Sequence, residues 1–396
     1  MEFFADATAT PDTAAGIGAL LARMADARTA PPSFAAIHLS AAHNAAAVRD
    51  AAKVAGIRVL HGGTSCLGVM AGGQMAADQN TGIGLFAIWD AEGRYGTGSA
   101  AKGTDARAAG RIATERALAQ AGCEGEAPHL VWLTAVPGAE EAVIAGIEDV
   151  VGTTTPIIGG SAADNDLSGQ WRSFDCADTY TDGVTVSVLF PSRPVSFAYQ
   201  NGYAPEGAVG RVSRAEGRTV HEIDGRPAAE VYGAWTGGAL PRADLAPVPI
   251  LAESTFHPLG RPVAEVMDVP FYLLAHPATA NPDGSLELFA NIAEGESLHL
   301  MGGSPDSLTA RAGRVARLAA RQGALAPSEV GAALMVYCGG CMLSVREAMD
   351  RVASEVHEAV GGAPSLGIFT FGEQGPVIDG QNRHGNLMIS CITFAR

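Results

Sequence analysis

Positive charge is scarce in this chain, and no segment concentrates it. The 396 residues include 26 lysines and arginines against 42 aspartates and glutamates, which gives a formal net charge of −16. Nucleic acids and acidic membrane surfaces bind proteins through clusters of Lys and Arg. We therefore expect neither a nucleic acid nor a membrane as a partner.

Cysteine is also rare, and the histidines form no familiar metal motif. Six cysteines are spread along the chain, of which only Cys338 and Cys341 form a C-x-x-C pair. Structural zinc takes four ligands, usually from two such pairs, and no His-Glu-x-x-His segment is present. We therefore expect reduced thiols that line a pocket or pack in the core, and no metal site. A reactive thiol pair is the alternative, because a helix that starts near Cys341 would lower a thiol pKa.

Long apolar segments are missing as well. The longest, residues 330–345, is interrupted by glycines and is shorter than the ~20 residues that a membrane-spanning helix needs. The first twelve residues carry acidic side chains and lack the cationic and apolar regions of a secretory signal. We expect a cytoplasmic protein.

The composition otherwise favours a large folded core. Hydrophobic residues make up 47% of the chain, and the mean hydropathy is +0.14. A chain of this length folds as about two domains, because single cores stop growing near roughly 250–300 residues. Two prolines, Pro191 and Pro194, interrupt the chain where a central strand could not contain them. We place the domains at residues 1–205 and 206–396.

Hydrophobic patterns alternate between strands and helices, which predicts a mixed α/β fold. Strands are expected at residues 33–39, 57–60, 82–89, 130–135, 156–160 and 183–190. Helices are expected at residues 44–55, 102–121, 140–151, 227–235 and 304–322, and residues 236–300 are rich in turns and short strands. Residues 130–190 and 331–394 share one order of elements: strand, helix, Pro-x-x-Gly, polar loop, strand. This echo indicates two related halves with mixed sheets and an internal duplication, although α/β proteins often repeat such an order.

Two glycine pairs follow apolar segments and are candidates for ligand contact. They belong to Gly62-Gly63-Thr64-Ser65 and to Gly159-Gly160-Ser161. Backbone amides beside paired glycines can hold an anion or a carboxylate, but such glycines can also simply form a turn after a strand. Residues 96–104 resemble a phosphate-binding loop only superficially, and we expect a turn that enters a helix.

The last thirty residues place a polar cluster between two apolar, strand-like segments. It contains Glu373, Gln374, Asn382, Arg383 and His384. Ligands of α/β sheets bind outside the carboxyl ends of strands, so we expect one pocket lined by these residues and the 338–341 turn. There, Arg383 could bind a ligand carboxylate while Glu373 binds an ammonium group, or the two could form a salt bridge with each other.

These segments resemble the FIST family, bacterial sensory proteins with consecutive N-terminal and C-terminal FIST domains. The resemblance covers nearly the whole chain. It is carried by residues 62–65, 157–165, 182–190, 214–232, 292–300, 338 and 367–386, in which Glu222-Ile-Asp-Gly-Arg-Pro-Ala228 and Phe369-Thr-Phe-Gly-Glu-Gln-Gly375 are the most specific. The resemblance implies small ligands, with amino acids proposed, and signalling partners. Some relatives bind haem and report nitric oxide to histidine kinases.

We therefore expect a small-ligand sensor without catalytic activity or a resident cofactor, which signals through a separate protein such as a histidine kinase. The candidate ligand-binding residues are Gly62, Gly63, Thr64, Ser65, Ser161, Cys338, Cys341, Arg346, Glu373, Asn382, Arg383 and His384. A haem-based nitric-oxide sensor is the first alternative, with His384 or Cys338 as the axial ligand. A cysteine-dependent enzyme, with Cys338 or Cys341 as nucleophile and His384 as base, is the second.

Overall fold

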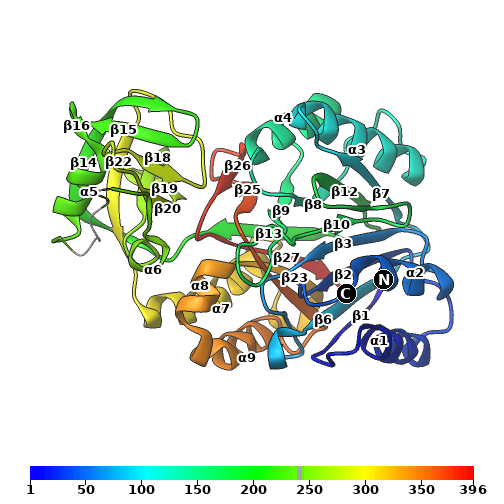
Figure 1. The fold of residues 1–396 in the computed structure, drawn as a ribbon. Coiled ribbons are helices and arrows are strands. Elements are labelled where there is room, and N and C mark those ends of the chain that lie inside the picture. The colour runs from blue at the N-terminus through cyan, green and yellow to red at the C-terminus, as the bar shows by residue number, and fades with distance from the viewer. Residues whose placement is uncertain (239–242, 244) are drawn as a thin grey trace.

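Strands from distant parts of the chain share sheets in this protein (Figure 1). The computed structural model describes residues 1–238, 243 and 245–396, so residues 239–242 and 244 of the expected turn-rich segment lie outside it. Within these residues the strands form three six-stranded sheets and one nine-stranded sheet, with helices packed on them. The mixed α/β prediction is confirmed. In the described part of the chain, no helix is both long and apolar enough to cross a membrane.

The first of three similar units spans residues 2–89. Its elements are β1 (Glu2–Thr8), α1 (Thr13–Ala27), β2 (Phe34–Leu39), α2 (Ala45–Val54), β3 (Leu60–Thr64), β4 (Val69–Ala71), β5 (Gln74–Ala76) and β6 (Ile83–Trp89). The sheet order is β1-β6-β2-β3, in which only β2 and β3 are parallel.

The second unit, residues 94–190, repeats this arrangement. Its elements are β7 (Arg94–Ala101), α3 (Ala106–Ala121), β8 (Leu130–Ala135), α4 (Glu140–Val151), β9 (Ile157–Ser161), β10 (Ser173–Phe174), β11 (Thr179–Tyr180) and β12 (Gly183–Phe190). The order β7-β12-β8-β9 and the single parallel pair, β8 with β9, match the first unit.

The third unit contains a long insertion after its first strand. Its elements are β13 (Val195–Gln200), α7 (Pro305–Gln322), β23 (Val330–Cys338), α8 (Gly339–Ser344), α9 (Met349–Ala359), β24 (Ser365–Thr370), β25 (Glu373–Pro376), β26 (Asn382–Gly385) and β27 (Ile389–Ala395). The order is β13-β27-β23-β24, again with one parallel pair. Asp12, Asp105 and Ser304 cap the equivalent helices α1, α3 and α7 with their side chains, which satisfies free amides of the first turn.

The echo between residues 130–190 and 331–394 is therefore confirmed, and residues 34–89 are a third copy that we did not predict. In all three units, the residue just before the second strand of the parallel pair accepts a backbone hydrogen bond from the other strand of that pair. This residue is Val59 before β3, Pro156 before β9 and Pro364 before β24. Because Val59 replaces the proline of the Pro-x-x-Gly motif, the first copy is hidden in the sequence.

In each unit, one strand of a hairpin pairs with the sheet of another unit. Strand β4 of the first unit pairs with β24 of the third, β10 of the second with β3, and β25 of the third with β9. The three units are thus interlocked in a cycle. The proposed domain boundary after residue 205 falls inside the first strand of the insertion and stays a prediction.

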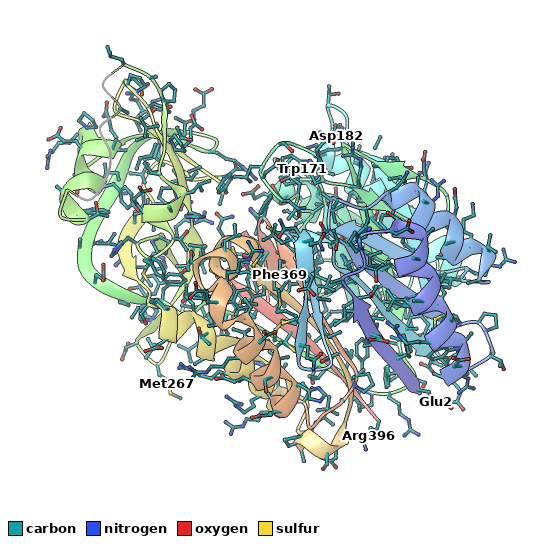
Figure 2. The ribbon with its side chains drawn as sticks, turned by 60° about the horizontal axis from the view of Figure 1, so that its bottom comes forward. Glu2, Trp171, Asp182, Met267, Phe369 and Arg396 are labelled. Carbon is teal, nitrogen blue, oxygen red and sulfur yellow. The ribbon has the colours of Figure 1, made fainter. Side chains whose placement is uncertain are left out.

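The insertion, residues 204–302, forms the nine-stranded sheet and lies to one side of the three units (Figure 1). Its elements are β14 (Ala204–Glu216), β15 (Thr219–Ile223), β16 (Arg226–Pro227), α5 (Ala228–Trp235), β17 (Val248–Pro249), α6 (Leu251–Ser254), β18 (Leu259–Val266), β19 (Val269–Ala275), β20 (Pro277–Ala280), β21 (Leu286–Leu288) and β22 (Ser297–Gly302). It has a hydrophobic cluster of its own around Tyr232 and Leu298. Met267 lies at the outer end of the β18–β19 hairpin, whereas Phe369 lies toward the middle of the molecule (Figure 2).

The glycine-rich segments were partly predicted wrongly. Residues 96–101 belong to strand β7 and are not a turn, and α3 begins only at Ala106. A Cβ atom on Gly96 would lie 2.0 Å from the carbonyl oxygen of Ala117 in α3, and one on Gly98 would lie 2.4 Å from that of Ala113. These glycines allow the helix to approach the strand closely.

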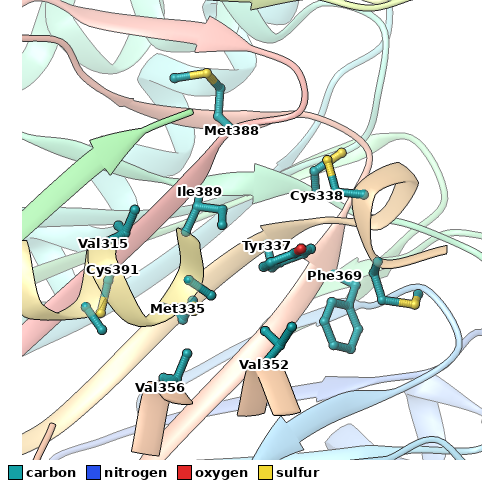
Figure 3. Packing of buried hydrophobic residues seen from close by; sticks show 14 of the residues in the cluster. Val315, Met335, Tyr337, Cys338, Val352, Val356, Phe369, Met388, Ile389 and Cys391 are labelled. Carbon is teal, nitrogen blue, oxygen red and sulfur yellow. The ribbon is translucent and has the colours of Figure 1, made fainter. Parts of the chain in front are cut away.

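The largest hydrophobic cluster lies in the third unit, between its sheet and the helices α7 and α9 (Figure 3). Val315 of α7 and Val352 of α9 face Met335 and Tyr337 of β23. The Tyr337 ring packs edge-on against Phe369 of β24, with ring centroids 6.3 Å apart. The end of β23, where Cys338 lies, is therefore held by a well-packed core.

Candidate functional site

A cavity of about 550 Å³ lies between the insertion and the three units. From the insertion it is lined by Leu251, Ala252, Thr255, Phe256, His276 and Phe289. From the units it is lined by Cys66, Asn165, Asp166, Leu167, Cys338, Gly340, Leu343, Ser344, Phe371, Gly372 and Asn386. Most of the latter follow the carboxyl ends of the parallel strands β3, β9, β23 and β24, which is where ligands of α/β sheets bind.

The wall of this cavity is mainly apolar and aromatic. Phe256, Phe289 and Phe371 enclose it together with three leucines. No Arg or Lys is among the residues that line it in the described part of the chain, and its single carboxylate, Asp166, is solvent-exposed. A small uncharged ligand with an apolar body suits such a wall better than an anionic ligand does.

Among the described residues of the wall, His276 is the one imidazole. It is 5% exposed, and burial lowers its pKa to about 4, so the ring is neutral at neutral pH. Its Nε2 lies 3.4 Å from the Thr255 hydroxyl, and its backbone amide donates to the Asn386 side chain. His276 is therefore positioned to exchange a hydrogen bond with a ligand without bringing a charge.

The two thiols of the C-x-x-C pair occupy different places. Cys338 lines the cavity, whereas Cys341 is fully buried behind it. The Cys341 sulfur accepts a hydrogen bond from Arg311 Nη2 at 3.1 Å and lies 3.5 Å from the Tyr203 hydroxyl. Burial raises the pKa of Cys341, but the neighbouring Cys338 thiol and the Arg311 charge outweigh it and lower the pKa to about 6.

The glycine segment of the first unit does not reach the cavity. Gly62 and Gly63 lie inside β3, where a Cβ atom would meet Phe174 and Thr134. The Thr64 hydroxyl accepts from the Arg172 amide, and the Ser65 hydroxyl accepts from the Phe369 amide. These side chains join strands within the core, so only the following residue, Cys66, contacts the cavity.

Ser161, Gln374 and His384 lie together, but none of them is among the residues that line the cavity. The Gln374 side-chain nitrogen lies 3.3 Å from the Ser161 hydroxyl and 3.1 Å from His384 Nδ1. His384 Nε2 donates to the carbonyl oxygen of Phe289 at 3.0 Å. Both ring nitrogens thus face protein groups, which does not fit His384 as an axial ligand of haem.

Glu373 and Arg383 do not meet. Glu373 is fully buried, where it accepts hydrogen bonds from the Thr370 hydroxyl and the Met388 amide, each at 2.9 Å. Arg383 instead contacts Gln381 and lies 3.9 Å from Asp379. Neither side chain lines the cavity, so the geometry does not support the expected binding of an amino acid between them.

Asn382 and Arg346 also lie away from the cavity wall. Asn382 joins units: its side-chain oxygen accepts from the Ile157 amide, and its nitrogen donates to Thr155 and Glu148. Arg346 is exposed and donates to the Asn80 side chain. Among residues 1–238, 243 and 245–396, no group of three or more His, Cys, Asp or Glu side chains is arranged to hold a metal ion.

Sequence reasoning missed the contribution of the insertion and of Arg311. No local pattern indicated that Phe256, His276 and Phe289 would face the carboxyl ends of strands in other units. Arg311 did leave a signal, because it falls on the apolar side of α7 among the buried residues Leu308, Ala312 and Val315. An arginine in an apolar stripe needs a partner inside the protein.

A charged clamp joins the insertion to the second unit beside the cavity. Arg218, in the turn between β14 and β15, pairs with Glu140 at 2.5 Å and with Glu141 at 3.1 Å. Glu141 also accepts from the Asn291 amide, two residues after Phe289 of the cavity wall. Burial raises the pKa of Glu140, but the charges of His384 and Arg218 outweigh it and lower the pKa to about 2.

Comparison with known proteins gives distant relatives of unknown function. The chain is 35% identical over 88 residues to the uncharacterized protein MJ1623 of Methanocaldococcus jannaschii, an alignment that covers 22% of the chain and 17% of that protein. It is 27% identical over 237 residues to the uncharacterized protein Mb0898c of Mycobacterium bovis, covering 58% of each. The alignments thus span less than two thirds of the length of these relatives.

Among solved structures, cyanuric acid hydrolase from A. caulinodans aligns over the full length of both chains with 12% identity and a TM-score of 0.40. A likeness at this level carries no argument about this protein. The family models are more informative: the FIST N domain matches residues 33–226 and the FIST C domain matches residues 228–376. Together they cover most of the chain, which therefore belongs to the FIST family, whose domains are sensor domains of signal transduction.

Proposed function

We propose that this protein senses a small, uncharged ligand with an apolar body, bound in the cavity between the insertion and the three units. The cavity itself is the observation that carries the proposal, because it is large enough for a small organic molecule and lies at the carboxyl ends of four parallel strands. A molecule bound there touches both the insertion and the units.

The chemistry of the wall supports an uncharged ligand. Phe256, Phe289 and Phe371 offer aromatic faces, and the polar groups of Thr255, His276 and Asn386 can fix orientation through hydrogen bonds. An amino acid could place its ammonium group near Asp166, but its carboxylate would lack a cation among the described wall residues. We therefore propose an uncharged ligand in place of the amino acid that the sequence led us to expect.

We further propose that the signal leaves through a separate cytoplasmic partner, such as a histidine kinase, and that the protein is not an enzyme. The support is physical: a ligand that contacts both the insertion and the units favours an arrangement in which these two walls lie close together, and a ligand shifts an equilibrium only by its differential affinity for two states. The Arg218 clamp joins the same two parts, and its Glu141 accepts from the Asn291 amide, so the clamp would respond to such a change.

Thermal unfolding with defined probes tests the ligand class. We expect indole and benzamide, both uncharged, to raise the melting temperature more than L-leucine and L-phenylalanine do. Ala252→Trp fills the cavity from α6 and should abolish the increase. Glu253→Trp, at the neighbouring exposed position outside the wall, should retain it. Equal responses in both variants would contradict binding in this cavity.

An absorption spectrum distinguishes the haem alternative from the proposed uncharged organic ligand. Protein mixed with haemin and freed of excess should show no stoichiometric Soret band if the cavity takes uncharged organic molecules. A stoichiometric band that shifts in Cys338→Ser would replace the present proposal with a haem-based one.

A further inference from the structure

Cys338 and Cys341 stand at the junction of a strand and a helix. Cys338 is the last residue of β23, and Cys341 lies in the first turn of α8. Cys338 is the residue before the first turn of α8 and Cys341 follows three residues later within that turn, so both side chains lie at the same end of the helix, and the Cys338 thiol lowers the pKa of Cys341. Only Cys338 faces the cavity.

The guanidinium of Arg311, which contacts the Cys341 thiol, is buried without an ion pair to a carboxylate of the described residues. It is 3% exposed, and no ion pair to Asp or Glu is formed by it in the described residues. Its Nη1 donates to the carbonyl oxygen of Leu387 at 3.0 Å, and its charge lies 5.5 Å and 5.4 Å from the ring centres of Tyr203 and Tyr337. A buried cation needs a counter-charge, and the Cys341 sulfur at 3.1 Å is the group placed to supply it.

The buried cluster therefore holds one positive and one negative charge. Burial raises the pKa of Cys338, and burial together with the negative charge of Cys341 raises the pKa of Glu373 to about 8. Cys341 is then the thiolate at neutral pH, whereas Cys338 and Glu373 carry protons. Thiolates, and not thiols, react with peroxides and disulfides.

We propose that Cys338 and Cys341 form a dithiol–disulfide site that is oxidised by a small hydroperoxide, such as hydrogen peroxide, entering through the cavity. The proposal does not depend on the ligand proposed above. A proton first moves from the Cys338 sulfur to the Cys341 sulfur, which leaves the thiolate on the sulfur that faces the cavity. The Cys338 sulfur attacks one peroxide oxygen, the O–O bond breaks, and the departing hydroxide takes the proton of Glu373 to become water.

The second step closes the disulfide. The Cys341 sulfur attacks the sulfenic acid on Cys338, an S–S bond forms, and the hydroxyl leaves as water with the Cys341 proton. The two sulfurs lose two electrons, and the peroxide gains them as two molecules of water. The negative charge that balances Arg311 passes from Cys341 to the Glu373 carboxylate, so the buried guanidinium keeps a counter-charge in both redox states.

Peptide mapping of the unaltered protein tests the proposal. The protein is reduced, freed of reductant, treated with one equivalent of hydrogen peroxide at pH 7, alkylated under denaturing conditions and digested. We expect the peptide with both thiols to lose both labels and to regain them after reduction. Cys66, which lines the same cavity but whose pKa is raised to about 12 by burial, should stay labelled. Oxidation of Cys66 or Cys176 while residues 338 and 341 keep both labels would overturn the proposal.

Two variants separate the steps. Cys341→Ser should slow the reaction with peroxide at least tenfold and leave Cys338 as a sulfenic or higher acid. Cys176→Ser, at a position that does not line the cavity, should react as the unaltered protein does. Infrared difference spectra should show that oxidation removes a protonated carboxyl band, and that Glu373→Gln removes this change. Disulfide formation without loss of that band would overturn the role given to Glu373.

Discussion

Arg218 of the insertion and Glu140 of α4 form an ion pair in which the carboxylate side chain is only 1% exposed. This contact links two segments that are 78 residues apart in the chain. Breaking a buried ion pair leaves one charge without its partner, which is more costly than the pair is stabilising. The pair therefore holds the insertion against the second unit more firmly than a surface ion pair would.

We expect Arg218→Met to lower the free energy of unfolding by about 3–5 kcal/mol, because Glu140 would stay buried without its cation. Urea denaturation measures the loss. Arg226→Met is the matched control, since Arg226 pairs with Glu230 at the surface, with both side chains more than half exposed, and should cost about 1 kcal/mol at most. Equal losses in the two variants would mean that the clamp contributes no more than a surface pair.

Glu373 predicts a specific dependence of stability on pH. Its folded pKa is raised to about 8 from an ordinary value of 4.5, so the folded state binds more protons between these values. The contribution of Glu373 to the free energy of unfolding should therefore be fully present below pH 4.5 and should decrease as the pH rises toward 8. The groups that face it are Arg311 of α7, Cys338 and Cys341, the Thr370 hydroxyl, the Met388 amide and Tyr199 of β13.

Glu373→Gln keeps a neutral side chain of the same shape and should remove this decrease. The comparison is cleanest between pH 4.5 and 6, below the range in which Cys341 titrates with its lowered pKa. We expect the unaltered protein to lose stability relative to the variant as pH rises through this interval. Parallel curves for the two proteins would show that Glu373 does not titrate there.

Gly96 offers a test of the close packing of α3 on β7. Gly96→Ala should destabilise by about 1–3 kcal/mol, because the new methyl group would meet the Ala117 carbonyl oxygen unless the helix moves. Gly233→Ala in α5 is the control, since its Cβ would meet nothing within 4 Å and alanine favours a helix. Thermal unfolding should show a decrease for the first variant and no decrease for the second.

Asn382 tests the exchange of hairpins between units. Asn382→Ala leaves the Ile157 amide and the Thr155 carbonyl without partners at the edge of the second sheet, so we expect a loss of about 1–3 kcal/mol. Hydrogen exchange should rise at β25, β26 and β9 together. Gln381→Ala, at the exposed neighbouring position, should leave exchange at β9 unchanged.

Local patterns sufficed for many elements of the fold. The strands at Leu130–Ala135 and Gly183–Phe190 and the helix Glu140–Val151 are confirmed at the predicted residues, and the helix predicted at residues 304–322 is α7, which Ser304 caps. These segments carry their own periodicity or capping side chain. The glycines of β3 and β7 misled us because glycine allows both a turn and a close approach of two backbones, and only the packing partner distinguishes them.

The site was less accessible to sequence reasoning. The cavity lies at the carboxyl ends of strands, where the sequence predicted a pocket, and Cys338 lies in its wall, but the site itself stays a prediction. The polar residues at 373, 382, 383 and 384 looked equivalent in sequence, yet they fall on different sides of β25 and β26 and face different partners. Which of them reaches a cavity depends on the insertion, whose position follows from contacts between segments far apart in the chain.

The exchanged hairpins have a consequence for how this chain can be made and cut. The first sheet is completed only when β10 pairs with β3. The β4–β5 hairpin pairs with β24, which lies nearly 300 residues further along the chain. During synthesis the early hairpin therefore leaves the ribosome long before its partner exists, and its edge must stay unpaired until the chain is almost complete. Contacts of such long sequence separation slow folding. A fragment that ends before residue 365 would expose that hairpin permanently, so truncated versions should aggregate where the whole chain folds.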